Sequence, residues 1–141
     1  MKVRGRVLAG GASAALLLSA LMGSQSALAA TPKETVKPST GLVNGSTVHV
    51  AVTGFPASKA LTAGQCAMVK AKIACNPGNE KKFKSTASGS GSTTMVVKLS
   101  FTGTFTGGGS AGTINCATKS CFIGVGAGGK TGTSVPISFK K

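Results

Sequence analysis

The sequence has 141 residues, a formal net charge of +14 and a hydrophobic fraction of 41%, with six phenylalanines but no tryptophan or tyrosine. It contains one histidine, two glutamates and no aspartate. Serine or cysteine triads and paired-carboxylate hydrolysis need a base and acids that this inventory does not supply, and hard cations lack their usual carboxylate ligands. We therefore predict a small protein that is not an enzyme and holds no metal ion.

The first 29 residues are typical of a secretory signal peptide. Three basic residues within the first six precede an apolar run over 7–21, and Ala-Leu-Ala at 27–29 forms a small-x-small cleavage site. The apolar run is too short for a membrane anchor. We therefore expect a signal peptide over 1–29 and one secreted, extracellular domain over 30–141. That domain has 13 lysines, no arginine and two glutamates, which is a net charge of +11.

Short segments with strand character, separated by Gly, Ser, Pro and Asn turns, follow one another from residue 30 onward. They are expected within 30–40, leading into an edge strand, and over 47–52, 61–70, 82–86, 93–101, 121–125 and 134–139. In the second segment Val48, Val50 and Val52 share one face, which leaves His49 pointing to solvent. No window outside the signal repeats its apolar residues at the helical period of 3.6. This pattern predicts an antiparallel β-sandwich.

Four cysteines lie in the exported domain, and thiols oxidise outside the cytoplasm. Cys66 and Cys75 are nine residues apart, and Cys116 and Cys121 are five apart. These spacings fit neither a zinc site nor a Cys-x-x-Cys redox pair, so we expect two disulfides. Four cysteines allow three pairings, of which the two short-range pairs are geometrically the simplest. Each short loop would stabilise the fold by roughly 2–3 kcal/mol.

The lysines would attract polyanions, such as nucleic acid, anionic lipid or acidic wall polymer, with a strength that depends on salt. Without arginine the domain cannot make bidentate contacts to guanine, and the core needs most of the phenylalanines that could stack on bases. We therefore expect any direct contact with DNA to be non-specific. The alternative is a solubilising surface with the lysines spread around it.

Residues 124–131 match the phosphate-binding pattern G-x-x-x-x-G-K-[ST]. That pattern binds phosphate when a strand precedes it and a helix follows it, and when an acid helps to hold magnesium. The next residues, Gly-Thr-Ser-Val-Pro-Ile at 132–137, do not predict a helix, and the chain has no aspartate. We interpret the match as chance in a glycine-rich hairpin loop.

Six short motifs are spread over the exported domain. They are Lys-Pro-Ser-Thr-Gly-Leu at 37–42, Gly-Gln-Cys-Ala at 64–67, Ala-Cys-Asn-Pro at 74–77, Ser-Phe with a glycine soon after at 100–103, Gly-Thr at 112–113 ahead of the third cysteine, and Val-Pro-Ile-Ser-Phe at 135–139. Taken together they resemble the neocarzinostatin family, secreted apoproteins that carry a reactive, DNA-cleaving enediyne chromophore. The resemblance implies a seven-stranded immunoglobulin-like antiparallel β-sandwich with a ligand cleft, and it implies that both disulfides are local.

The resemblance also implies which residues line the cleft. Carried over position by position, they are Thr62, Gly64, Met68, Ile73, Thr104, Phe105, Thr106, Phe122 and Gly126. Met68 stands where the family prototype has a tryptophan, and Thr104 and Thr106 stand where it has phenylalanines. The pocket is therefore less aromatic than the prototype's, although methionine still offers an adaptable apolar surface.

Two functions follow as hypotheses. The first is a monomeric carrier that binds a small aromatic or polyene molecule, of the enediyne type, without a covalent bond. Antimicrobial or cytotoxic action on DNA would then belong to that molecule. The second is a ligand-free basic antimicrobial or surface-binding protein whose charge acts on anionic membranes, wall polymers or DNA; its association would be sensitive to salt. No specific feature supports a third possibility, an extracellular adhesion module.

Overall fold

The computed structural model describes residues 30–128 and 130–141, except for the side chain of residue 131. The expected secretory signal over 1–29 lies outside the described residues. Ten strands are present in the described part of the chain, namely β1 (Lys33–Lys37), β2 (Thr47–Thr53), β3 (Ala60–Val69), β4 (Lys72–Cys75), β5 (Lys81–Lys84), β6 (Gly91–Val96), β7 (Ser100–Phe105), β8 (Ser110–Asn115), β9 (Cys121–Ala127) and β10 (Lys130–Ile137). Within these residues no helix is long and apolar enough to cross a membrane.

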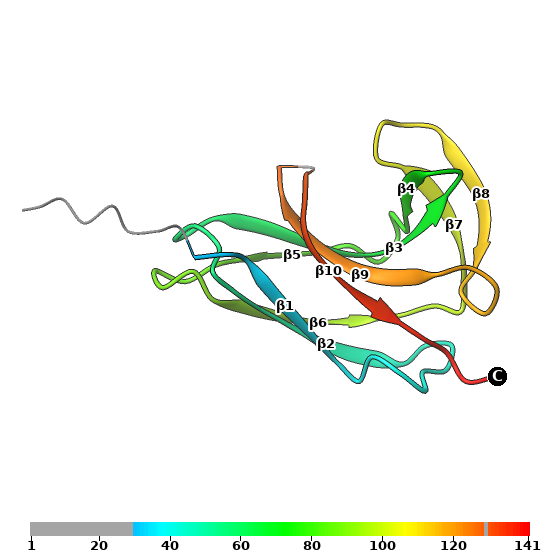
Figure 1. Ribbon diagram of the computed structural model, residues 1–141, viewed down its shortest axis with the longest axis horizontal. Coiled ribbons are helices and arrows are strands. Elements are labelled where there is room, and N and C mark those ends of the chain that lie inside the picture. The colour runs from blue at the N-terminus through cyan, green and yellow to red at the C-terminus, as the bar shows by residue number, and fades with distance from the viewer. Residues whose placement is uncertain (1–29, 129) are drawn as a thin grey trace, which may run out of the picture.

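The strands form two sheets. One has the order β1-β2-β6, and the other runs β10-β9-β3-β4-β7-β8, with β5 also pairing with β3. Every strand pair is antiparallel. Figure 1 shows the small sheet as the lower layer, β3, β9 and β10 above it, and β4, β7 and β8 standing apart on the right. The predicted all-β antiparallel sandwich is confirmed.

The core lies between the two layers because each strand alternates its side chains between the two faces. In β2 the three valines at 48, 50 and 52 are at most 2% exposed, whereas His49 is exposed as predicted. In β3 Leu61, Ala63 and Ala67 face inward and are at most 1% exposed. The alternate residues of β3 therefore point to the outer face of the large sheet.

The predicted strand over 93–101 is wrong, because the chain leaves one sheet and enters the other inside it. β6 ends at Val96 in the small sheet, and β7 begins at Ser100 in the large one. Met95, Val97 and Phe101 are all buried, so the apolar alternation continues through the crossover although the strand does not. A period of two in the sequence shows which side chains are buried but not which sheet they belong to.

The number of strands also differs from the seven that the resemblance implied. The ten-residue β3 pairs along one edge first with β5 and then with β4, so that two short strands share one neighbour. β8, which the sequence analysis did not anticipate, returns beside β7 after the turn that contains the glycine run at 107–109.

Both disulfides are local, as the resemblance implied. Cys66 and Cys75 are opposite each other on β3 and β4 and are bonded. Cys116 and Cys121 are bonded across the loop that joins β8 to β9. One bridge therefore links the two strands of the β3–β4 hairpin, and the other links the end of β8 to the start of β9.

Candidate functional site

Three glycines lie side by side on the outer face of the large sheet. The strand register places Gly64 of β3 opposite Gly124 of β9, and Thr62 opposite Gly126. Glycine has no side chain, so the backbone of the sheet is left uncovered at this point. A Cβ atom added to Gly64 would meet the nearest atoms, Cys66 Sγ and Glu80 Cγ, at 3.8 and 3.9 Å, which is ordinary van der Waals contact. The sequence therefore builds a hollow by omitting side chains.

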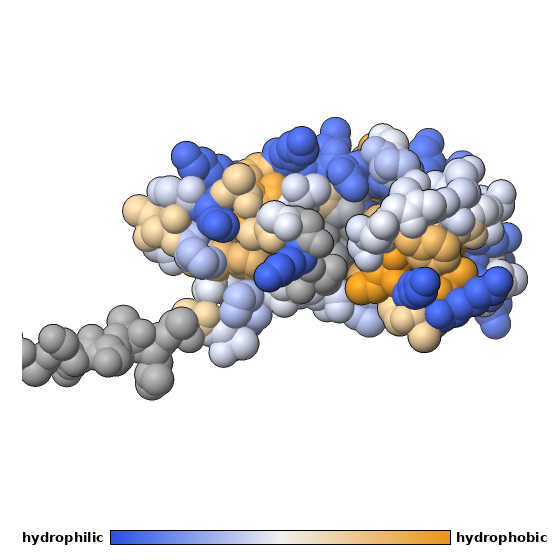
Figure 2. Space-filling view, turned by 90° about the horizontal axis from the view of Figure 1, so that it is seen from above, coloured by the Kyte–Doolittle hydropathy of each residue, from blue (hydrophilic) through white to orange (hydrophobic). Residues whose placement is uncertain are grey.

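This hollow has a volume of about 120 Å³. It is lined by Thr62, Gly64, Cys66, Cys75, Glu80, Thr106, Gly124, Gly126 and Lys130. A second hollow of about 250 Å³ adjoins it, lined by Cys75, Pro77, Glu80, Thr104, Phe105 and Thr106. The two share three lining residues, so they form one groove between the β9–β10 hairpin and the β4–β7 edge. In Figure 2, which looks onto this side, a notch separates the lobe on the right from the rest of the surface.

The structure brings six of the nine predicted cleft residues to the groove. Thr62, Gly64, Thr106 and Gly126 line the first hollow, and Thr104, Phe105 and Thr106 line the second. The Lys72 ammonium lies over the Phe105 ring, 5.9 Å from its centroid, in cation–π geometry.

The other three predicted residues, Met68, Ile73 and Phe122, line neither hollow. Met68 and Ile73 are opposite each other on β3 and β4, two residues beyond the disulfide on each strand, and Met68 is 47% exposed. Phe122 is opposite Cys66 and is half-buried. All three lie on the same outer face as the disulfide, so they extend the surface of the groove rather than form its walls.

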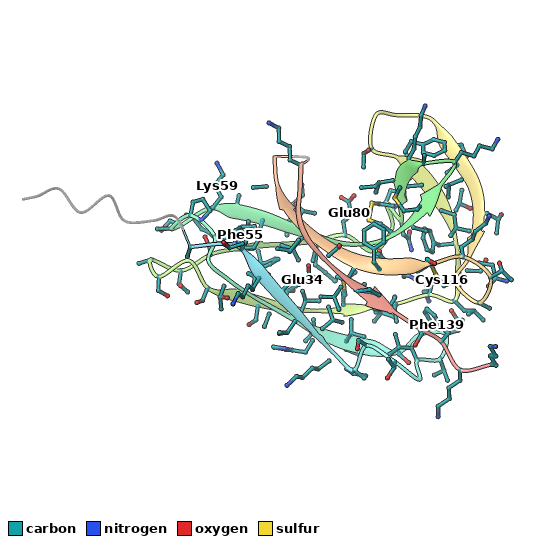
Figure 3. The ribbon with its side chains drawn as sticks, in the orientation of Figure 1. Glu34, Phe55, Lys59, Glu80, Cys116 and Phe139 are labelled. Atoms are coloured by element: carbon teal, nitrogen blue, oxygen red, sulfur yellow. A yellow bond between two sulfur atoms is a disulfide. The ribbon has the colours of Figure 1, made fainter. Side chains whose placement is uncertain are left out.

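Sequence reasoning missed Glu80, Gly124 and Lys130. Glu80 follows directly after Asn79, whose side chain ties this loop to β3 and β6. Asn79 Nδ2 donates to Gln65 Oε1 at 3.1 Å and to the Val96 carbonyl at 3.0 Å. In Figure 3 Glu80 lies in the space between the β9–β10 hairpin and β4. The sequence did carry a signal for Gly124, because it lies between Ile123 and Val125, whose side chains pack in the core, and therefore faces the outer side of the sheet.

Lys130 begins β10 at the tip of the glycine-rich hairpin. The segment after the G-x-x-x-x-G-K-[ST] match is therefore a strand, and the helix that phosphate binding by this pattern requires does not follow it. Lys130 and Glu80 instead supply the groove with one positive and one negative side chain.

The described part of the chain contains no free cysteine, and no three His, Cys, Asp or Glu side chains within it could hold a metal ion together. The groove offers the hydroxyls of Thr62 and Thr106, the charged side chains of Glu80 and Lys130, and the uncovered backbone of the glycines. Such a surface can hold a small molecule by packing and hydrogen bonding.

The second glutamate, Glu34, lies away from the groove, on the inner face of β1. Thr133 Oγ1 on β10 donates to Glu34 Oε2 at 2.7 Å, and Oε1 is buried without a hydrogen-bond partner among the described residues. Burial raises the pKa of Glu34 to about 7, although the Thr133 hydroxyl opposes that shift. This carboxyl joins the two sheets and has no part in the groove.

Comparison with known proteins identifies relatives along most of the chain. The profile of the Neocarzinostatin family matches residues 35–139. The chain is 37% identical over 115 residues to the antitumor antibiotic C-1027 apoprotein of Streptomyces globisporus, covering 82% of this chain and 80% of that protein. It is 39% identical over 108 residues to apokedarcidin of an actinomycete, covering 74% and 94% respectively. Among solved structures, macromomycin is similar with a TM-score of 0.72 and 34% identity, over 77% of this chain and 99% of that one.

Proposed function

This chain belongs to the neocarzinostatin family, and we propose that it is a secreted, non-enzymatic carrier that holds a small aromatic or polyene molecule in the groove on the outer face of β3 and β9. The observation that carries the proposal is the hollow left by Gly64, Gly124 and Gly126 beside the Cys66–Cys75 disulfide. The relatives support it, because one of them is named as the apoprotein of an antitumor antibiotic.

A flat molecule suits this hollow because no side chain intervenes between it and the backbone of the sheet. A ligand that buries about 200 Å² of apolar surface there gains roughly 5 kcal/mol before the entropy of association is subtracted. The disulfides hold the groove walls in place without the ligand, and this preorganisation lowers the cost of binding. Threonine hydroxyls at 62 and 106 give the ligand hydrogen-bond partners and fix its orientation.

We further propose that the cargo is an enediyne-type chromophore, held without a covalent bond, and that its target is DNA. The family resemblance supports this assignment. The protein would shield the cargo from water and thiols, and the antimicrobial or cytotoxic action would belong to the cargo.

Native mass spectrometry with an absorbance spectrum, on protein purified from the culture fluid of its own host, tests the carrier. We expect a stoichiometric extra mass and absorbance beyond that of phenylalanine. A bare mass under gentle conditions, with both disulfides formed, would contradict the proposal.

A second candidate function is a ligand-free basic protein that acts by charge. The described residues include 13 lysines and two glutamates, and every one of these lysines is exposed, which supports this function. Association with anionic surfaces that collapses between about 50 and 200 mM salt, in protein without cargo, would favour it.

A further inference from the structure

Glu80 is the one exposed acidic side chain of the described residues, which include 13 exposed lysines. It lines both hollows of the groove. Its side chain extends over the floor of the first hollow, because a Cβ atom added to Gly64 would lie 3.9 Å from Glu80 Cγ. The hydrogen bonds of the preceding Asn79 side chain hold this part of the loop in place. The fold therefore places its exposed carboxylate at the groove (Figure 3).

The two hollows differ in charge. Lys130 lines the first hollow together with Glu80, but it does not line the second. Among the described residues that line the second hollow, Glu80 is the one that carries a charge. Thr104 and Thr106 add hydroxyl groups beside it. The second hollow is therefore negative, although it lies in a strongly basic domain.

Phe105 adds an aromatic ring to the lining of the second hollow. The ammonium group of Lys72 lies over this ring, 5.9 Å from its centroid. The face of an aromatic ring attracts a cation at about this distance. Lys72 itself lines neither hollow, so its ammonium group approaches the ring from outside the groove. The second hollow thus combines a carboxylate with a ring that already has a cation beside it.

We propose that the second hollow binds a protonated amine of the cargo, between the Glu80 carboxylate and the Phe105 ring, while the flat part of the cargo lies over the glycines of the first hollow. This subsite rests on the proposed function, since it requires a small-molecule cargo in the groove. An ammonium group donates charge-assisted hydrogen bonds to a carboxylate and is attracted to the ring face. A neutral group in its place would cover the carboxylate without giving it a partner, which costs free energy. Glu80 is therefore a specificity-determining residue that favours a cationic cargo.

Two fluorescent probes of similar shape test the subsite on protein without cargo. Naphthylethylamine carries an ammonium group at neutral pH, and naphthylethanol carries a hydroxyl group in its place. Fluorescence anisotropy gives the Kd of each probe, and the protein adds little background because it has no tryptophan or tyrosine. At low salt we expect the amine to bind at least about fivefold more tightly than the alcohol, as expected for one ion pair at a partly exposed site.

Three variants assign this preference to the subsite. Glu80→Gln removes the charge and keeps the shape, and the preference should disappear. Thr94→Lys is the matched control, because it raises the net charge by the same amount at an exposed position opposite His49, on the outer face of the small sheet. The preference should persist in the control. It should fall at least about twofold in Phe105→Leu, which loses the ring but keeps an apolar side chain.

A preference that persists in Glu80→Gln, or that is lost equally in Thr94→Lys, would overturn the subsite. Equal binding of the two probes to the unaltered protein would overturn it too, although binding that Gly64→Val abolishes would still support the carrier. Absence of binding by both probes would also overturn the subsite. Native mass spectrometry of the protein from its host decides separately whether a cargo is held, so the two proposals can fail independently.

Discussion

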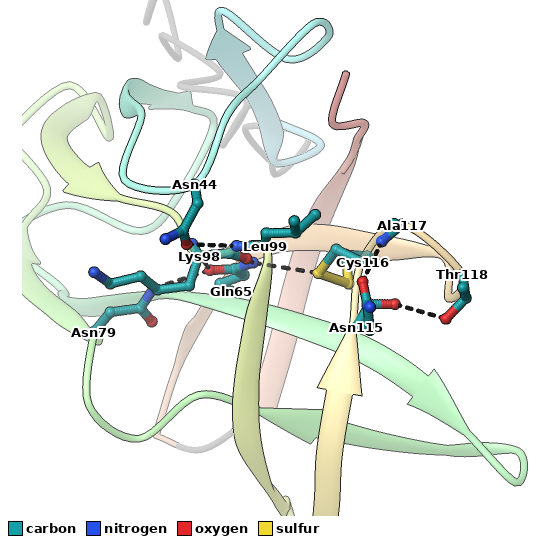
Figure 4. The surroundings of a disulfide bond; sticks show 10 residues. Asn44, Gln65, Asn79, Lys98, Leu99, Asn115, Cys116, Ala117 and Thr118 are labelled. Atoms are coloured by element: carbon teal, nitrogen blue, oxygen red, sulfur yellow. Dashed lines mark hydrogen bonds between the residues drawn. A yellow bond between two sulfur atoms is a disulfide. The ribbon is translucent and has the colours of Figure 1, made fainter. Parts of the chain in front are cut away.

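The side chain of Gln65 pairs with the backbone of Lys98 as a neighbouring strand would. Gln65 Nε2 donates to the Lys98 carbonyl at 2.6 Å, and the Lys98 N–H donates to Gln65 Oε1 at 2.8 Å (Figure 4). This exchange occurs where the chain crosses between the sheets after β6, and Gln65 is fully buried. Gln65 Oε1 also accepts from Asn79, the residue before Glu80. One amide therefore supports both the crossover and the loop that brings Glu80 to the groove.

Replacing Gln65 by leucine should lower the free energy of unfolding by about 2–4 kcal/mol, because the Lys98 backbone and the Asn79 amide lose partners at partly buried positions. Urea unfolding measures the change. Asn44→Ala is the control, since the Asn44 Oδ1 contact with the Leu99 N–H, at 3.0 Å, belongs to the same crossover but is exposed. We expect less than about 1 kcal/mol from the control, and a comparable loss in both variants would show that burial is not the cause.

Stability should fall as the pH rises, because of Glu34. Its pKa is raised from 4.5 to about 7 in the folded protein, so the folded state binds this proton more tightly than the unfolded chain does. The contribution is fully present below about pH 4.5 and is lost as the pH rises through about 7. We expect Glu34→Gln to remove about 1–2 kcal/mol of pH dependence, after allowance for the partial exposure of this side chain. Urea unfolding of both proteins across this range would reject the assignment if the dependence persisted in the variant.

Gly64→Val should empty the carrier without unfolding it. Valine suits a strand, and the first atom it adds has ordinary contacts, but its methyl groups project into the first hollow. We expect cargo retention to fall at least about tenfold and the free energy of unfolding to change by less than about 1 kcal/mol. Native mass spectrometry and urea unfolding give the two values. Gly107→Val, at a β7–β8 turn position with open space around it, is the control and should retain the cargo. Full retention in the Gly64 variant would place the cargo elsewhere.

Met68→Lys tests how far the cargo extends past the disulfide. Met68 lines neither hollow and is half-exposed, so the variant should keep its stability. A cargo that reaches the Met68–Ile73 pair should bind about tenfold more weakly, which corresponds to a loss of about 1–2 kcal/mol of apolar contact. Dissociation of the cargo, followed by its absorbance, measures this. An unchanged rate would confine the cargo to the two hollows and would remove Met68 from the site.

The residues alone were sufficient for the properties that depend on local pattern. The alternation in β2 predicted its buried valines and exposed His49, the short cysteine spacings made local disulfides the simplest pairing, and the motifs indicated the family. The tertiary structure decided what depends on partners far apart in the chain. Gln65 bonds to Lys98 from 33 residues away, in the crossover between β6 and β7 that interrupts the strand predicted as continuous. The pairing of β3 with β9, which lie far apart in the sequence, places Gly64 opposite Gly124 and Thr62 opposite Gly126 and so opens the hollow. Side-chain periodicity encodes the face that a residue takes, whereas its neighbours follow from which strands pair and in what register.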